Sequence, residues 1–150
     1  MKTQQETEPI IERRVSDSWS IVIPETLSET RNDVQAFWHG EDDHRWISTN
    51  TLLVIGPDGP VPAPLIHGQL RAMTAGIAGA QPFPEFPPGL LGWAVTAPAP
   101  GSTVAGIALS GVLVADGHAL LVTIAADDLD WVRQTWLSFR FYRAGPLRAH

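Results

Sequence analysis

Two apolar runs, residues 104–115 and 119–126, flank the tripeptide Asp116-Gly117-His118. An Asp-Gly pair between apolar runs is typical of a tight β-hairpin, because glycine adopts a positive φ without steric cost. The whole stretch is long enough to span a membrane, but Asp116 sits at its middle, where a charge is most costly, and so the hairpin is favoured. Both strands are apolar on both faces. We therefore expect the sheet that contains them to be covered on each side.

The other elements are predicted from hydrophobic periodicity and from the positions of proline. Pro24 ends a first alternating strand over 18–23, and Pro64 suits the start of a helix because its missing amide hydrogen would be unpaired there,. Asp127 or Asp128 can cap a closing helix. Further strands are expected over 34–39, 45–55, 89–96 and 103–115, the first helix over 64–79, a loop or short helical turn over 25–33, and a buried stripe on the closing helix at Leu129, Val132, Trp136 and Phe139.

The strands over 34–39 and 45–55 bracket residues 40–44 and are predicted to form a second hairpin. In the predicted register Phe37 lies opposite Trp46, and Trp38 lies opposite Arg45. Aromatic cross-strand pairs of this kind stabilise a ladder by roughly several tenths of a kcal/mol.

These elements follow one another as three strands, a helix, three strands and a second helix. We expect an α+β fold in which a single six-stranded, mostly antiparallel sheet carries a helix on each face. A chain of 150 residues suits one domain,. Residues 1–11 are polar and aperiodic and are expected to be a flexible tail, with a single globular domain over 12–150,.

Charge and composition narrow the function classes. The net charge of −6 argues against a nucleic-acid partner and against anionic membrane surfaces, which attract clustered cations,. The chain has no cysteine, which excludes disulfides, thiolate nucleophiles and Cys-type zinc sites,. The N-terminal residues lack the apolar core of a secretory signal. We therefore expect a cytoplasmic protein without membrane insertion.

The segment 39–44 is the best candidate for a metal site, because it holds two imidazoles and three carboxylates. Nitrogen and oxygen ligands of this kind suit zinc or a similar cation, with His39, Asp43 and His44 as the candidate ligands. The spacing matches no recognised ligand motif, and a charged turn that keeps the hairpin soluble is the favoured interpretation. Neither a Gly-x-Ser-x-Gly elbow nor a Walker lysine is present, so we expect no catalytic residues and no cofactor,.

Six tryptophans are unusual for a chain of this size. Trp136 lies on the apolar stripe of the closing helix and is expected in the core. Trp131 falls off that stripe, and Trp38 and Trp46 flank the second hairpin turn. Exposed aromatic side chains are enriched at interfaces, so Trp38, Trp46 and Trp131 are candidates for binding a partner, with sheet packing as the alternative.

The closure of the first strand at Ile23-Pro24, the mid-chain helix and the final hairpin followed by a helix together resemble the Mog1/PsbP-like fold over residues 14–142. That group includes the DcrB-like and DUF1795 bacterial proteins. The resemblance implies a mostly non-catalytic role, because its members include adaptors, photosystem subunits and chaperones for secreted effectors. No functional residue of the group maps onto a matching position.

The leading hypothesis is a non-catalytic module that binds a protein partner, as a chaperone, adaptor or immunity-type protein of a bacterial secretion or toxin system. The alternatives are a small-molecule or lipid binder with a cleft between the sheet and the helix over 64–79, and a metal-dependent enzyme at His39–His44. An apolar sheet edge or exposed tryptophans would also support a homodimer, and the oligomeric state is left open.

Overall fold

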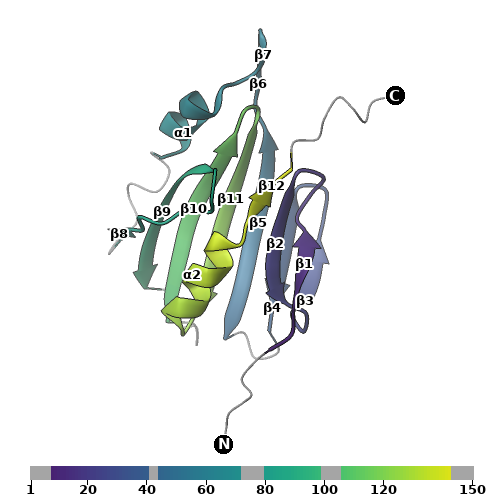
Figure 1. Cartoon of the computed structure of the whole chain (residues 1–150), viewed down its shortest axis with the longest axis vertical. Coiled ribbons are helices and arrows are strands. Elements are labelled where there is room, and N and C mark those ends of the chain that lie inside the picture. Colours follow the sequence, from purple (N-terminus) through teal and green to yellow (C-terminus); the bar gives the residue numbers. More distant parts are fainter. Residues whose placement is uncertain (1–7, 41–43, 72–79, 99–105, 143–150) are drawn as a thin grey trace, which may run out of the picture.

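The computed structural model describes residues 8–40, 44–71, 80–98 and 106–142 (Figure 1). Its main sheet has seven antiparallel strands in the order β3-β4-β5-β11-β10-β9-β8. The central strands are the longest, since their apolar side chains are buried on both faces,. The strands are β3 (Ser28–Arg31), β4 (Gln35–His39), β5 (Arg45–Leu53), β8 (Gln81–Pro82), β9 (Leu91–Pro98), β10 (Ile107–Ala115) and β11 (His118–Ala126).

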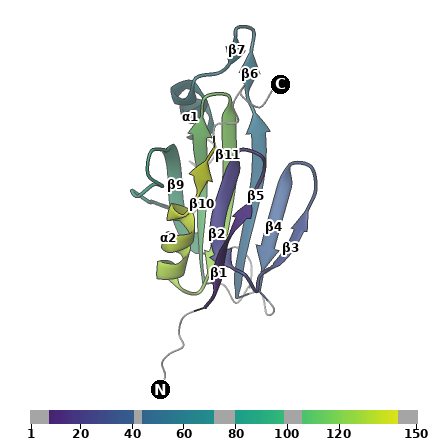
Figure 2. The same ribbon diagram turned by 45° about the vertical axis from the view of Figure 1, so that its right-hand side comes forward.

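A second, three-stranded sheet packs with helix α2 (Leu129–Leu137) on one face of the main sheet. It consists of β1 (Ile10–Arg14), β2 (Trp19–Pro24) and β12 (Arg140–Phe141) in the order β1-β2-β12. Figure 2 shows β1 and β2 in front of the central strands, with β3 and β4 at one edge. The core of this face holds Trp19, Trp38 and Trp136, which are all fully buried.

Helix α1 (Ala63–Arg71) covers part of the opposite face, where Ile66 packs against Val112, Val114 and Ala119. The two helices therefore lie on opposite faces of the sheet, as the apolar character of β10 and β11 predicts. The predicted end of the first helix, over residues 72–79, lies outside the described residues. Within the described ranges, neither helix is both long and apolar enough to cross a membrane.

The α+β class and the mostly antiparallel pairing are confirmed, but the strand count and order differ from the prediction. The main sheet has seven strands instead of six, and the first predicted strand, β2, belongs to the second sheet. Strand β1 begins within the predicted tail, and β3 forms in the polar stretch predicted as a loop or short helical turn. The two-residue strands β6 (Ile55–Gly56), β7 (Gly59–Pro60), β8 and β12 are too short to show periodicity,.

The register of the β4–β5 hairpin is shifted by two residues from the prediction. His39 lies opposite Trp46, and Phe37 lies opposite Ser48. The Gly40 amide donates to the Arg45 carbonyl at 3.0 Å, so the pairing continues one step further into the predicted turn. A shift of two keeps every side chain on its predicted face, because the side-chain period of a strand is two.

The Asp116-Gly117 turn joins β10 to β11 as predicted, with Ala115 opposite His118. Gly117 has φ of +76°, and a Cβ at this position would lie 2.7 Å from the Pro60 Cβ,. The Asp116 carboxylate accepts a hydrogen bond from the Ala63 amide at 2.8 Å. The turn therefore fixes both the β6–β7 hairpin and the start of α1.

Helix α2 begins where the sequence predicts. The Asp128 carboxylate accepts a hydrogen bond from the Asp130 amide at 3.0 Å and caps the first turn,. Val132 and Trp136 are buried as expected. Leu129 was also expected to be buried but is 47% exposed, and Thr135 is buried instead. Leu129 lies in the first turn, before the helix meets the sheet.

Candidate functional site

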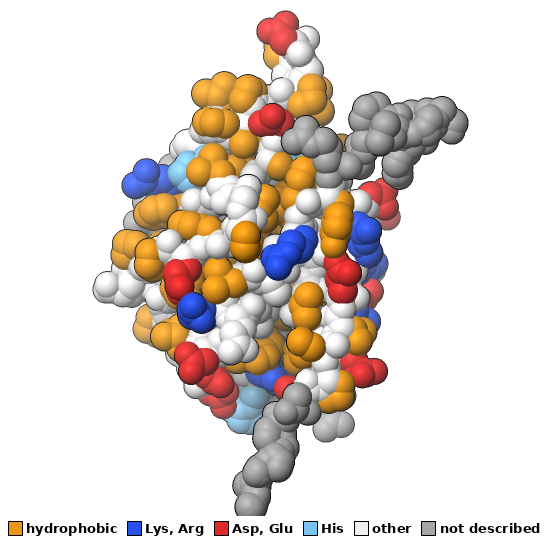
Figure 3. Space-filling view, viewed as in Figure 1, with side chains coloured by type: hydrophobic (Ala, Val, Ile, Leu, Met, Phe, Trp, Pro, Cys, Tyr) orange, Lys and Arg blue, Asp and Glu red, His pale blue; other side chains and the backbone are white. Residues whose placement is uncertain are grey.

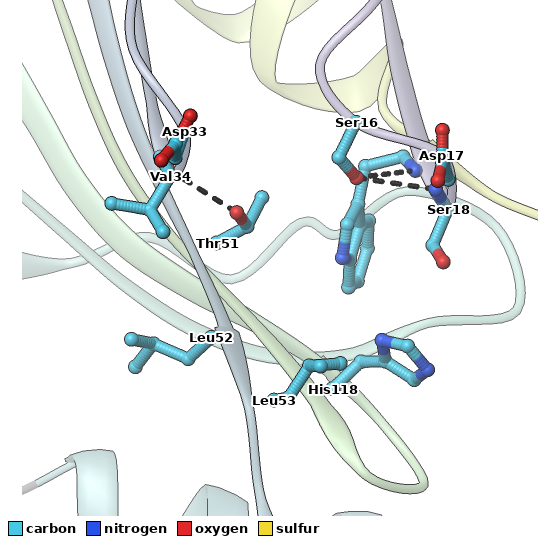
Figure 4. A pocket seen from close by; sticks show the side chains of 10 residues that line it. Ser16, Asp17, Ser18, Asp33, Val34, Thr51, Leu52, Leu53 and His118 are labelled. Atoms are coloured by element: carbon cyan, nitrogen blue, oxygen red, sulfur yellow. Dashed lines mark hydrogen bonds between the residues drawn. The ribbon is translucent and has the colours of Figure 1, made fainter.

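The main candidate site is a pocket of about 590 Å³ between the turn that joins β1 to β2 and the ends of β5 and β11 (Figure 4). It opens on the face of the main sheet that carries α2. Its walls come from four stretches of the chain that are distant in sequence. They are Ser16, Asp17, Ser18, Trp19, Asp33, Val34, Thr51, Leu52, Leu53 and His118.

The β1–β2 turn is held in place by hydrogen bonds to its own backbone. The Ser16 hydroxyl oxygen accepts from the amides of Ser18 at 3.1 Å and Trp19 at 3.3 Å, a local pattern that favours turns. The Arg31 guanidinium of β3 donates to the Val15 carbonyl at 2.9 Å. The turn is thus tied to the main sheet, and the buried indole of Trp19 lines the pocket.

The rim of the pocket is apolar and exposed. Val34 is 54% exposed and Leu53 is 72% exposed. The neighbouring Leu52 lies opposite Ala119, so its side chain points to the α1 face,. Val34 lies in a turn, where its amide donates a hydrogen bond to the Asn32 carboxamide oxygen at 3.1 Å. The Val34 carbonyl accepts a hydrogen bond from the Thr51 amide at 2.8 Å. We call Val34 and Leu53 the aliphatic rim. Aliphatic side chains grouped around a hollow are typical of binding sites.

Polar side chains also line the pocket. Asp17 and Asp33 are exposed, and Figure 4 shows them on opposite sides of the pocket. The His118 ring lies 5.0 Å from the Phe141 ring, and burial lowers the pKa of this imidazole, which favours its neutral form,. The Ser16 hydroxyl oxygen already accepts a hydrogen bond from the Ser18 amide within the turn. The pocket can thus receive an apolar group with a cation beside it.

A second pocket of about 460 Å³ lies between α2 and the β1–β2 hairpin. Trp131 stands at its edge, with the Arg45 guanidinium 4.9 Å from the centre of its ring. Arg45 is held by two hydrogen bonds to the Glu8 carboxylate at 2.9 and 2.6 Å, which lower the pKa of Glu8. Figure 3 shows hydrophobic side chains interspersed with acidic and basic ones over this face.

The structure does not bring the three predicted partner-binding tryptophans together. Trp38 is 0% exposed, and its indole nitrogen donates to the Glu29 carboxylate at 2.8 Å. The prediction that Trp38 contributes to a binding surface is therefore wrong, because its ring is packed in the core beside the sheet. Trp46 is half-buried against Ala108 and Ala125, on the α1 face. Trp131 lies on the opposite face, and a partner-binding role for these two stays a prediction.

The predicted metal ligands are only partly described. The His39 Nδ1 lies 3.1 Å from the Gly40 carbonyl oxygen, and the His44 Nδ1 lies 3.4 Å from an Asp127 carboxylate oxygen. Asp43 lies outside the described residues. Among the residues that are described, no three His, Cys, Asp or Glu side chains form a metal-binding group.

The predicted cleft between α1 and the sheet is a different place from either pocket, since both lie on the α2 face. Sequence reasoning missed the pocket that the aliphatic rim surrounds. One signal was available: residues 52–55 read Leu-Leu-Val-Ile and break the alternation expected of a half-buried strand,. Such a run at the end of a strand indicates exposed aliphatic side chains.

No family model matches the chain, and no curated protein does. Among solved structures, the fold is similar to the solution structure of cyanobacterial PsbP (CyanoP) from Synechocystis sp. PCC 6803. The TM-score is 0.56 at 11% sequence identity, over 95% of this chain and 98% of that one. The chain thus has a PsbP-like fold, of the Mog1/PsbP-like type that its sequence resembles.

Proposed function

We propose that this chain is a non-catalytic protein-binding module whose partner docks on the aliphatic rim. The observation that carries the proposal is the pair of exposed aliphatic side chains, Val34 and Leu53, beside a pocket of about 590 Å³. Leaving aliphatic side chains in water forfeits hydrophobic stabilisation, and such patches mark interaction sites. Within this class, the roles we propose are a chaperone, an adaptor or an immunity-type protein of a bacterial secretion or toxin system.

The surroundings of the rim suit a docking site. Leu52 and Leu53 end β5, which pairs along its length with the central strand β11. Trp19 behind the rim is fully buried and packs edge-on against Phe141, with ring centres 4.9 Å apart. A rigid apolar pocket loses little entropy when a partner side chain enters it.

The test is site-specific photo-crosslinking in the native host. A benzophenone amino acid is placed at Leu53 or, as the matched control, at Leu129, which is also exposed but lies at the start of α2. We expect a discrete protein adduct from position 53 and none of the same mass from position 129.

The same crosslink is then repeated with Val34→Asp, which places a charge on the rim without touching the core. The adduct from position 53 should weaken or disappear. Equal adducts from positions 53 and 129, or no protein adduct from position 53, would contradict the proposal.

A small apolar molecule is a second candidate occupant, and the pocket volume favours it. Ligand pockets run from about 300 to 1,000 Å³, and this one measures about 590 Å³,. Native mass spectrometry of the purified protein separates the two functions. A ligand of defined mass that is lost in Leu53→Asp would support this second function.

A further inference from the structure

We infer that the partner enters the pocket with a bulky apolar side chain carried next to arginine or lysine. This inference rests on the function proposed above and names the chemistry of the partner. The apolar part follows from the aliphatic rim and from the Trp19 wall. The basic part follows from the charges around the pocket.

The carboxylates of Asp17 and Asp33 flank the apolar opening on opposite sides (Figure 4). Neither forms a salt bridge with another residue in the described ranges. Both side chains are exposed. A partner cation can therefore meet a carboxylate on either side of its apolar anchor.

The nearby guanidinium groups are already engaged. Arg31 donates to the Val15 carbonyl at 2.9 Å and to the Arg14 carbonyl at 2.7 Å. Arg14 donates to the Asp17 carbonyl at 3.2 Å and lies 4.4 Å from the centre of the Tyr142 ring. These two guanidinium groups contact backbone carbonyls and the Tyr142 ring. The Asp17 and Asp33 carboxylates therefore stay available to a partner.

His118 adds no positive charge to the pocket at neutral pH. Its imidazole is half-buried beside Phe141, and a neutral ring does not repel an incoming cation. The whole chain carries a net charge of −6, which attracts a basic segment from a distance,.

The same charges disfavour a second copy of this chain as the occupant. A two-fold contact through the aliphatic rim would bring the Asp17 and Asp33 carboxylates of both copies close together. Like charges brought together at an interface oppose association. The structure therefore favours a basic partner of different sequence.

The test is a selection of random twelve-residue peptides against the full chain and two variants. The variants are Leu53→Asp, which charges the rim, and the double variant Asp17→Asn with Asp33→Asn, which keeps side-chain size. For the wild type we expect enrichment of a leucine, isoleucine or phenylalanine next to arginine or lysine. The double variant should still enrich apolar residues and lose the basic ones, and Leu53→Asp should enrich neither.

One enriched basic peptide is then synthesised and its affinity measured at 50 mM and 500 mM salt. Exposed ion pairs are individually weak, so the double Asn variant should bind roughly twofold to thirtyfold more weakly at low salt. The difference should shrink at high salt, where exposed charges are screened. Val34→Asp is the second rim variant, should Leu53→Asp melt below the wild type.

The outcomes separate this inference from the function on which it rests. Enrichment of apolar peptides without basic residues, or equal basic peptides from the double Asn variant, overturns the inference and leaves the function standing. No enrichment against the wild type, or the same peptides from Leu53→Asp, overturns both. A dimer in light scattering that Leu53→Asp dissociates would make a second copy the occupant and overturn the basic partner.

Discussion

One face of the main sheet is closed in its middle and open at its end. In the middle, Trp38, Trp136 and Phe139 fill the space between the sheet and the elements above it. At the end, the covering element is the turn Ser16-Asp17-Ser18, whose small polar side chains cannot fill the same depth, and a pocket remains. The difference teaches that the pocket arises from what covers the sheet, because both regions share the same strands.

The largest expected effect lies in the closed region. Trp136→Ala removes a fully buried indole that also donates to the Glu85 carbonyl at 2.8 Å. We expect a loss of about 3 to 5 kcal/mol in the free energy of unfolding, measured with denaturant. Leu129→Ala, on the exposed first turn of the same helix, should cost about 0.5 kcal/mol or less. Equal losses for the two variants would contradict the description of Trp136 as buried and Leu129 as exposed on this helix.

A smaller effect is expected at the polar edge of the closed region. Glu29→Ala leaves the indole N–H of buried Trp38 without its acceptor at 2.8 Å, which should cost about 1 to 3 kcal/mol. Hydrogen bonds from Arg31 and Trp38 lower the pKa of Glu29 below its ordinary value of 4.5. The stabilisation is therefore complete above pH 4.5 and is lost as the pH falls through the lower, folded-state pKa. Glu25→Ala, at an exposed site, is the matched control. The free energy of unfolding is measured against pH for the wild type and for Glu29→Gln. If the difference between these two proteins stayed constant toward low pH, this assignment would be contradicted.

The open region should respond to pH through His118. Burial lowers the pKa of His118 below 6.5, so the unfolded chain binds more protons between the two values. Stability is therefore complete above pH 6.5 and declines as the pH falls toward the folded-state pKa. The free energy of unfolding is measured with denaturant from pH 7.5 to 5.5 for the wild type and for His118→Phe. The wild type should lose more stability than His118→Phe over this range. Parallel curves for the two proteins would show that His118 is not buried as described.

The smallest change in stability is expected at the aliphatic rim. Leu53 is largely exposed, and Leu53→Ala should alter the free energy of unfolding by about 0.5 kcal/mol or less while it weakens partner binding,. Thermal unfolding and crosslinking at position 34 measure the two effects separately. A loss of more than about 2 kcal/mol would place Leu53 in the core and remove the contrast with Trp136.

The parts of the fold that were predicted correctly depend on local chemistry. Asp116-Gly117 specifies its turn because only two residues are available to reverse the chain, and the apolar character of β10 and β11 requires cover on both faces. Asp128 caps α2 through its own neighbours. These features need no knowledge of distant residues.

The parts that were missed depend on distant pairing. Nothing local distinguishes β2 as a member of a second sheet, since its partner β12 has two residues and follows α2. The charged strand β3 forms because Glu29 and Arg31 find partners across the sheet edge. The pocket combines Asp17, Val34 and Leu53 with His118, and no spacing in the sequence places them together.

The pairing of β2 with β12 has a consequence for the order of events during biosynthesis. The Ser138 hydroxyl bonds the Val22 backbone across 116 residues of chain, and Phe141 lies opposite Trp19. We therefore expect the β1–β2 turn to reach its final place over the main sheet only after synthesis has passed Phe141. The proposed partner should accordingly meet a complete docking site only on a chain whose synthesis has passed β12.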